Sequence, residues 1–137
     1  GDYLRNQDIF INNITGIDIS PEMTGVARYL TTSDNNPTYN EIIEIDFREY
    51  LNDREKNLGR TYHLILSGLS FQYVNGLESV LKDAKNMLNN GGIIAFLVEK
   101  SDSKEIIFDR TRDHYCFSEL YIKQIAKLVG LNVINIS

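Results

Sequence analysis

Five short apolar segments, separated by helix-like patterns, constrain the fold of this chain more than any other feature. Residues Ile93-Ile94-Ala95-Phe96-Leu97-Val98 run without the apolar and polar alternation of a half-exposed strand. The five predicted strands are Ile14–Ser20, Glu41–Phe47, Tyr62–Ser67, Ile93–Glu99 and Asn132–Ile136. Continuous apolar runs of this kind are typical of strands that are covered on both faces.

Helical patterns occupy much of the sequence between these strands. Ser20-Pro21-Glu22 is a start signal, because serine caps helices, proline fits the first turn and an acid favours the positive end of the helix dipole. The predicted helices run from Ser20 to about Thr31, from Leu77 to Leu88, where Asn89–Gly92 stops it, and from Ser118 to Gly130. Helices alternating with strands predict parallel pairing through right-handed crossovers.

Three segments are less clearly patterned. Asp2–Asn6 is interpreted as the tail of a helix, and Arg48–Lys56 as either a short helix or a loop. Lys100–Phe117 is the longest stretch without a clear element, and a loop of that length is often functional or mobile. The predicted fold is an α/β, Rossmann-like doubly wound, mostly parallel sheet with helices on both faces.

Length and composition narrow the class of protein. The 137 residues predict one domain, since roughly 150 residues per domain is the usual expectation. A net charge of −5 without a Lys/Arg cluster disfavours nucleic acid and anionic membranes as partners. No apolar run reaches the roughly 18 residues of a membrane span. The single Cys116 fits a reducing compartment, so a cytoplasmic location is predicted.

The ends of the first predicted strands carry residues that suit an adenosine group. The carboxylate of Asp18 could accept hydrogen bonds from two vicinal ribose hydroxyls, and Asp46 could accept from an adenine amine. Ile19 and Phe47 would then pack against the adenine ring. The simpler interpretation of each aspartate is a turn or cap residue. Small residues Ser67-Gly68 follow the third strand and would let a ligand approach the backbone.

The order of these segments resembles the class I S-adenosylmethionine-dependent methyltransferases. The pieces that carry the resemblance are Ile14–Met23, Glu44–Phe47, Tyr62–Ser67 and Leu88–Phe96, in that order. Tyr115–Ile122 and Ala126–Val133 are similar to predicted methyltransferases that are sometimes attached to tetratricopeptide repeats. The resemblance implies S-adenosylmethionine as cofactor, ribose contacts from Asp18, adenine contacts from Ile19, Asp46 and Phe47, and a wall formed by Ser67 and Gly68.

Departures from the family pattern lead to further expectations. The sequence does not show the family's N-terminal glycine-rich loop and first strand, nor its last strand, so we expect residues 1–137 to be a truncated methyltransferase-type domain. His63 stands where the family often has aspartate, and Leu69 where a polar residue is frequent. No catalytic residue is therefore assigned. A sheet without its central strand also predicts a homo-oligomer or a strand-completing partner.

Two other functions fit the same residues. A NAD-dependent oxidoreductase fragment would also place an acid at the end of its second strand. A non-catalytic truncated or degenerate domain would need no cofactor. For a methyltransferase, the acceptor is expected to be a small molecule or a protein. His63, His114 and Cys116 do not have the spacing of metal ligands, so no metal site is predicted.

Overall fold

The computed structural model describes residues 11–137, and the chain divides into two compact units, Gly1–Lys56 and Asn57–Ser137. We call these the N-terminal unit and the C-terminal unit and describe each by itself. The predicted helix tail at Asp2–Asn6 lies outside the described residues. None of the helices within residues 11–137 has the length and apolar character needed to cross a membrane.

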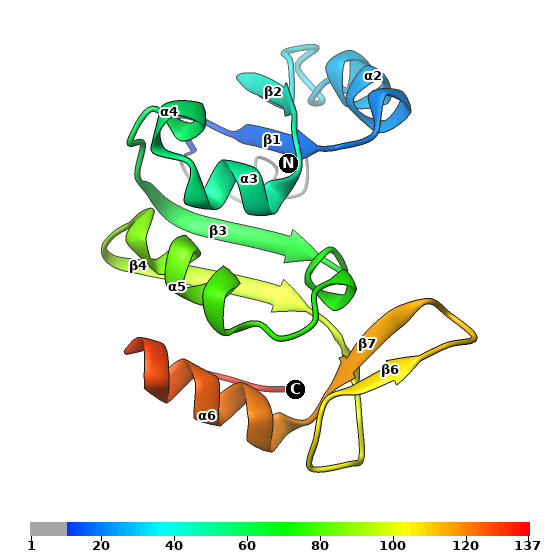
Figure 1. The fold of residues 1–137 in the computed structure, drawn as a ribbon. Helices are drawn as coiled ribbons and strands as arrows, with labels where there is room; N and C mark the ends of the chain where they lie inside the picture. The colour runs from blue at the N-terminus through cyan, green and yellow to red at the C-terminus, as the bar shows by residue number, and fades with distance from the viewer. Residues whose placement is uncertain (1–10) are drawn as a thin grey trace. The chain divides into compact units, whose positions relative to one another are not determined.

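The N-terminal unit contains a pair of parallel strands, β1 (Thr15–Asp18) and β2 (Glu41–Glu44), as Figure 1 shows. Their register places Asp18 opposite Glu44. Helix α2 (Pro21–Tyr29) connects the strands and packs against both of them. The first two predicted strands and their parallel pairing are therefore confirmed, although both strands are shorter than expected.

Helix α2 begins where the sequence predicts and ends slightly earlier. The hydroxyl of Ser20 accepts a hydrogen bond from the backbone N–H of Met23 at 3.3 Å, and Pro21 is the first helical residue. At the other end Leu30 has extended backbone angles, so the helix ends at Tyr29 and not near Thr31. A serine cap and a proline define the start of a helix, whereas no comparable signal marks this end.

The segment after β2 forms two short helices, α3 (Phe47–Asn52) and α4 (Arg54–Asn57). The expectation of either a helix or a loop at Arg48–Lys56 is therefore resolved in favour of helix. Asp46 caps α3 by accepting a hydrogen bond from the backbone N–H of Arg48. Tyr50 of α3 is buried, with 1% of its surface exposed.

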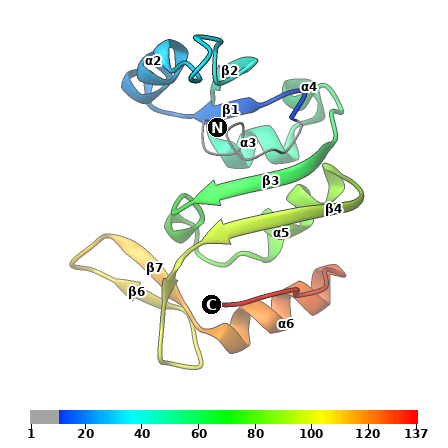
Figure 2. The ribbon, with the colours of Figure 1, turned by 180° about the vertical axis from the view of Figure 1, so that it is seen from behind.

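The C-terminal unit is built on a second parallel pair, β3 (Tyr62–Gly68) and β4 (Leu88–Leu97), drawn from behind in Figure 2. Between them lie a short 3-10 helix, η1 (Phe71–Tyr73), and helix α5 (Glu78–Asn86). The buried apolar side chains of this unit are Phe71, Leu77, Val80, Leu81, Ala84, Met87, Cys116, Phe117, Ile125 and Ala126. Leu77, Val80, Leu81 and Ala84 lie at helical spacing within the predicted helix Leu77–Leu88, so this periodicity identified a true core face.

The segment Asn89–Gly92 does not act as the predicted stop between helix and strand. Helix α5 ends at Asn86 and β4 begins at Leu88, so these four residues belong to the strand. They form an irregularity in it, since Tyr62 pairs with Leu88 but Leu64 pairs with Ile93. Gly91 takes a positive φ of 74° there, a conformation that glycine adopts without steric cost.

The stretch Lys100–Phe117, predicted to be a loop, contains most of a small sheet, and that prediction is wrong. The sheet has the order β5-β7-β6, formed by β5 (Glu99–Lys100), β6 (Ile107–Asp109) and β7 (His114–Phe117). Strands β5 and β7 are parallel, and β6 and β7 are antiparallel. Strands β5 and β6 have two and three residues, too few positions to show a clear period in sequence, and the apolar run of β7 is only Tyr115–Phe117.

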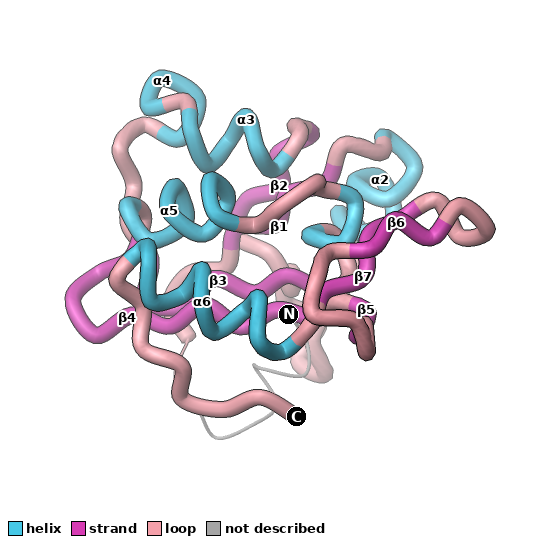
Figure 3. The backbone as a smooth tube through the Cα atoms, turned by 60° about the horizontal axis from the view of Figure 1, so that its bottom comes forward, coloured by secondary structure: helices cyan, strands magenta, loops and turns pink. Residues whose placement is uncertain are grey.

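Helix α6 (Glu119–Val129) follows and lies beside α5, as Figure 3 shows. Both predicted ends are confirmed: the hydroxyl of Ser118 accepts from the N–H of Tyr121 at 3.1 Å, and Gly130 is left-handed with a φ of 77°. The predicted strand at Asn132–Ile136 is wrong, because residues 131–137 pair with no strand among the described residues. An apolar pattern does not reveal whether a partner edge is available.

The observed class is mixed α/β with parallel pairing, but the described residues do not confirm a single doubly wound sheet. Their strands form three separate sheets, in which β1 pairs with β2 alone and β3 pairs with β4 alone. Side chains on one face of the β3–β4 pair are exposed, namely Leu64, Leu66, Ile93 and Leu97. The predicted helical cover on both faces is therefore not observed. The expected oligomer or strand-completing partner stays a prediction.

Candidate functional site

Asp18 ends β1 and has part of its carboxylate available to a ligand. Its Oδ1 accepts a hydrogen bond from the backbone N–H of Ser20 at 2.8 Å, which fixes the side chain in a tight turn. Its Oδ2 makes no hydrogen bond with any described residue. The turn contact confirms the structural interpretation of Asp18 without excluding the binding role, because Oδ2 and one lone pair of Oδ1 can still accept.

Ile19 follows Asp18 and presents an apolar side chain that is 66% exposed. Met23, in the first turn of α2, is also exposed. Exposed aliphatic groups beside a free carboxylate oxygen suit a ligand with an apolar ring and a polar sugar. This arrangement follows directly from the end of β1 and the serine cap of α2.

Asp46 lies two residues beyond the end of β2 and does not end the strand itself. Its Oδ1 accepts from the backbone N–H and from Nε of Arg48, at 2.8 and 3.0 Å, and its Oδ2 accepts from Nη2 of Arg48 at 2.7 Å. The side-chain hydrogen bond from Arg48 lowers the pKa of Asp46 below its ordinary value. Both oxygens are thus engaged, and a cap and ion-pair role is established for this residue.

The two predicted pairs, Asp18 with Ile19 and Asp46 with Phe47, lie at the same edge of the N-terminal unit. The backbone N–H of Ile45 donates to the carbonyl oxygen of Asp18 at 3.0 Å, one residue before Asp46. Phe47 begins α3, and the Arg48 guanidinium lies 5.9 Å from the centre of its ring. The carboxyl ends of β1 and β2 therefore gather Asp18, Ile19, Asp46 and Phe47 at one edge, as the rule for parallel sheets requires.

Ser67 and Gly68 end β3 in the C-terminal unit. The hydroxyl oxygen of Ser67 is buried and has no hydrogen-bond partner among the described residues. A side chain added at Gly68 would meet nothing within 4 Å, so the backbone there faces open space. A buried hydroxyl without a partner is costly, which makes Ser67 a residue that a polar ligand or a water would stabilise.

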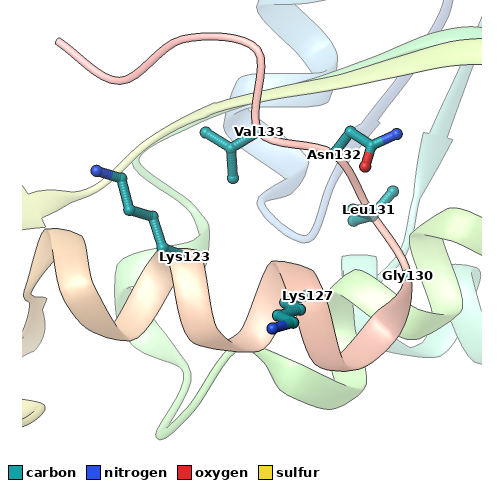
Figure 4. Close-up of a pocket in the computed structure, with 6 residues that line it drawn as sticks. All are labelled: Lys123, Lys127, Gly130, Leu131, Asn132 and Val133. Carbon is teal, nitrogen blue, oxygen red and sulfur yellow. The ribbon is translucent and has the colours of Figure 1, made fainter.

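A shallow pocket in the C-terminal unit does not involve these residues. It has a volume of about 380 Å³ and lies between α6 and the segment that follows it, as Figure 4 shows. Its lining residues are Lys123, Lys127, Gly130, Leu131, Asn132 and Val133. None of the six residues predicted to bind the cofactor is among them, so the pocket gives no support to that site.

The structure also assembles a group of residues that was not predicted from the sequence. Ligand-type atoms of Glu99, His114 and Cys116 lie within 4.8 Å of one another. His63, which was considered together with His114 and Cys116, is on β3 and is not part of the group. The spacing His114-x-Cys116 was the available signal in the sequence. It indicates two side chains on the same face only if that segment is a strand.

Comparison with known protein families agrees with the order of elements around these strands. A family model described as a methyltransferase domain matches residues 2–96, which is more than half of the chain. This chain belongs to that methyltransferase domain family. Membership supports S-adenosylmethionine-dependent methyl transfer in general, since the family typically uses that cofactor. No curated protein matches the chain.

Proposed function

We propose that this chain binds S-adenosylmethionine through the edge formed by the carboxyl ends of β1 and β2, and transfers its methyl group to a small molecule or a protein. The observation that carries the proposal is Asp18, a strand-end carboxylate fixed by Ser20 with Oδ2 open to a ligand. The family match adds the reaction class. The acceptor, the activity of this chain alone and the resemblance to repeat-associated methyltransferases are likewise proposals.

The residues of this edge fit the adenosine part of the cofactor. Asp18 would accept hydrogen bonds from the ribose hydroxyls, and charged acceptors of this kind form strong hydrogen bonds. Ile19 and Phe47 would supply apolar surface to the adenine ring. Because Arg48 already engages both oxygens of Asp46, we propose that Asp46 mainly fixes the start of α3 and so positions Phe47.

The proposed role of Ser67 and Gly68 rests on different observations. The buried hydroxyl of Ser67 lacks a partner, and the backbone at Gly68 faces open space. A polar group of the cofactor would form a hydrogen bond with the hydroxyl of Ser67 and would fit against the backbone of Gly68. These two residues are in the C-terminal unit, so their role is a separate proposal that does not depend on Asp18.

The residues of this chain need only bind and orient the reactants, because the cofactor supplies the reactive group. When bound, S-adenosylmethionine supplies a methyl group on a sulfonium, from which a nucleophile displaces it. Orientation of the reactants and exclusion of water are then the tasks of the protein. A general base is needed only for an acceptor that must lose a proton. No described residue is assigned that role.

The test is calorimetric titration of the full chain with S-adenosylhomocysteine and, in parallel, with NADH. We expect binding of S-adenosylhomocysteine alone. Asp18→Asn should weaken it by roughly 10- to 100-fold, since hydrogen bonds to charged groups contribute about 1.5–3 kcal/mol. Asparagine can still accept the turn hydrogen bond from Ser20, so the fold should be retained.

Asp34→Asn is the matched control, because Asp34 is an exposed acid in the same unit, outside the strand ends. It should leave the affinity unchanged. Binding of NADH in place of S-adenosylhomocysteine would support the oxidoreductase interpretation. Binding of neither would support a non-catalytic domain, and an unchanged affinity in Asp18→Asn would remove Asp18 from the site.

A further inference from the structure

Glu99, His114 and Cys116 come from two neighbouring strands of the β5-β7-β6 sheet. Glu99 of β5 is the direct partner of Cys116 of β7 in the parallel register. His114 is two residues before Cys116 on the same strand, so both side chains point to the same face. Pairing and alternation therefore place a carboxylate, an imidazole and a thiol side by side. Figure 3 labels the three strands.

The hydrogen bonds of His114 define what its second nitrogen can do. Its Nδ1 lies 3.2 Å from the carbonyl oxygen of Arg112, which accepts a hydrogen bond in the tautomer that carries the hydrogen on Nδ1. In the neutral ring Nε2 is then an acceptor, yet it lies 2.8 Å from Oε2 of Glu99, which is also an acceptor. A proton or a cation must lie between these two atoms.

The two carboxylate oxygens of Glu99 have different partners. Oε1 forms an ion pair with Arg112, whereas Oε2 faces His114. Arg112 is held in turn by Asp109, whose Oδ2 lies 3.4 Å from its Nε. Outer contacts that orient a ligating carboxylate and imidazole are a general feature of metal sites. Oε2 of Glu99, Nε2 of His114 and Sγ of Cys116 are thus the three inward-facing atoms.

Burial is compatible with a bound ion that stays accessible from one side. His114 and Cys116 are 6% and 9% exposed, and the side chain of Glu99 is 32% exposed. The rings of Tyr73 and His114 meet in a T-shaped arrangement, with 6.4 Å between ring centres. His114 and Cys116 are thus held in a packed environment, whereas the carboxylate of Glu99 is partly exposed to solvent.

We propose that Glu99, His114 and Cys116 form a binding site for Zn²⁺ or a similar divalent transition metal. Thiolate, imidazole and carboxylate are the ligands that Zn²⁺ takes in proteins, and three protein ligands leave one coordination position open. Binding converts the Cys116 thiol to a thiolate and releases its proton to solvent. A carboxylate and a thiolate then neutralise the two charges of the ion.

The test is calorimetric titration of the full chain, freed of metal by a chelator, with Zn²⁺ alone. We expect one ion per chain. Cys116→Ser and Glu99→Gln should each weaken binding by roughly 100-fold or more, since even outer contacts are worth about 10–100-fold. With Co²⁺ as the probe, the wild type should show a thiolate-to-metal absorption band that Cys116→Ser lacks.

His63→Gln is the matched control, because it alters the other histidine of the chain and should leave Zn²⁺ binding unchanged. Circular dichroism of each variant verifies that the fold is retained. Absence of stoichiometric Zn²⁺ binding would overturn the proposal and leave a hydrogen bond between His114 and Glu99. Equal affinity of wild type and Cys116→Ser, or loss of binding in His63→Gln, would overturn it as well.

Discussion

The two units differ in how much apolar surface they bury. Of the eleven buried apolar side chains among the described residues, Tyr50 alone is in the N-terminal unit and the other ten are in the C-terminal unit. The N-terminal unit instead exposes apolar groups of α2, including Met23 and Val26. Its other well-buried side chains are polar, among them Thr24, whose hydroxyl lies 3.3 Å from Oε2 of Glu44 on β2.

This difference shows that the two parallel pairs are supported in different ways. Helices α5 and α6 give the C-terminal unit a core of its own, which is what stabilises a small sheet. Parallel strands are normally covered on both faces, and the described part of the N-terminal unit shows little such cover around β1 and β2. The proposed adenosine-binding edge is therefore in the unit with the smaller core.

The largest expected effect is on the core of the C-terminal unit. Leu81 is 1% exposed, and Leu81→Ala should lower the free energy of unfolding by about 2–5 kcal/mol. The loss combines the transfer energy of the removed atoms with the cavity that remains. Urea unfolding followed by circular dichroism measures it.

Val26→Ala is the matched truncation in the N-terminal unit, where Val26 is 58% exposed. Surface substitutions usually change the free energy of unfolding by less than about 0.5 kcal/mol. A loss as large as that of Leu81→Ala would contradict the contrast between the units, since it would show that α2 is buried in solution.

A smaller effect is expected from two glycines, one in each unit. Gly130 ends α6 in the left-handed region, where a side chain costs roughly 1–2 kcal/mol. The added Cβ would also lie 2.6 Å from Nζ of Lys85, which donates to the carbonyl of Val129. Gly130→Ala should therefore lower the thermal midpoint.

Gly25 is the counterpart, because it lies inside α2 and an added Cβ would meet nothing within 4 Å. Gly25→Ala should raise the free energy of unfolding by about 0.5–1 kcal/mol, since alanine favours the helix. Differential scanning calorimetry compares the two variants. If both variants became more stable, or both less stable, then either Gly130 does not end α6 in the left-handed region or Gly25 does not lie inside α2.

The smallest expected effect concerns Asp46. Asp46→Ala removes the cap of α3 and should cost about 1 kcal/mol at neutral pH. The pKa of Asp46 is lowered in the folded state by its hydrogen bond with Arg48, so this stability is present above the ordinary pKa of about 4 and is lost as pH falls through the lowered value.

Urea unfolding of wild type and Asp46→Ala at neutral and acidic pH measures this difference. The two proteins should converge in stability at low pH. Asp46→Asn keeps an oxygen that can cap the helix and should lose less at neutral pH. A gap between wild type and Asp46→Ala that persists in acid would show that the charge of Asp46 is not the source of the stability.

Local signals allowed much of this fold to be predicted from the sequence. The starts of α2 and α6 and the end of α6 depend on Ser20, Ser118 and Gly130, whose effects act over a few residues. The strands β1 to β4 were found because their apolar runs are long enough to stand out. The pairing that forms β5, β6 and β7 has no such local signal, which explains why these three strands were missed.

The candidate site shows the same division between local and distant information. Asp18 at the end of β1 was found because a carboxylate after an apolar run is visible in sequence. The engagement of Asp46 by Arg48 was not, because an ion pair two residues apart depends on how the chain turns into α3. Glu99 was missed for a related reason, since only the register of β5 with β7 brings it to Cys116.

The irregularity in β4 has a consequence for changes in chain length. A step of two residues on β3, from 62 to 64, matches a step of five on β4, from 88 to 93. An inserted residue among 89–91 would enlarge this irregularity and leave Ile94 and Phe96 on the half-buried side of the pair. The same insertion after Ile93 would turn them to the exposed side, because neighbouring strand residues face opposite ways. Length tolerance in this strand is therefore confined to its first half.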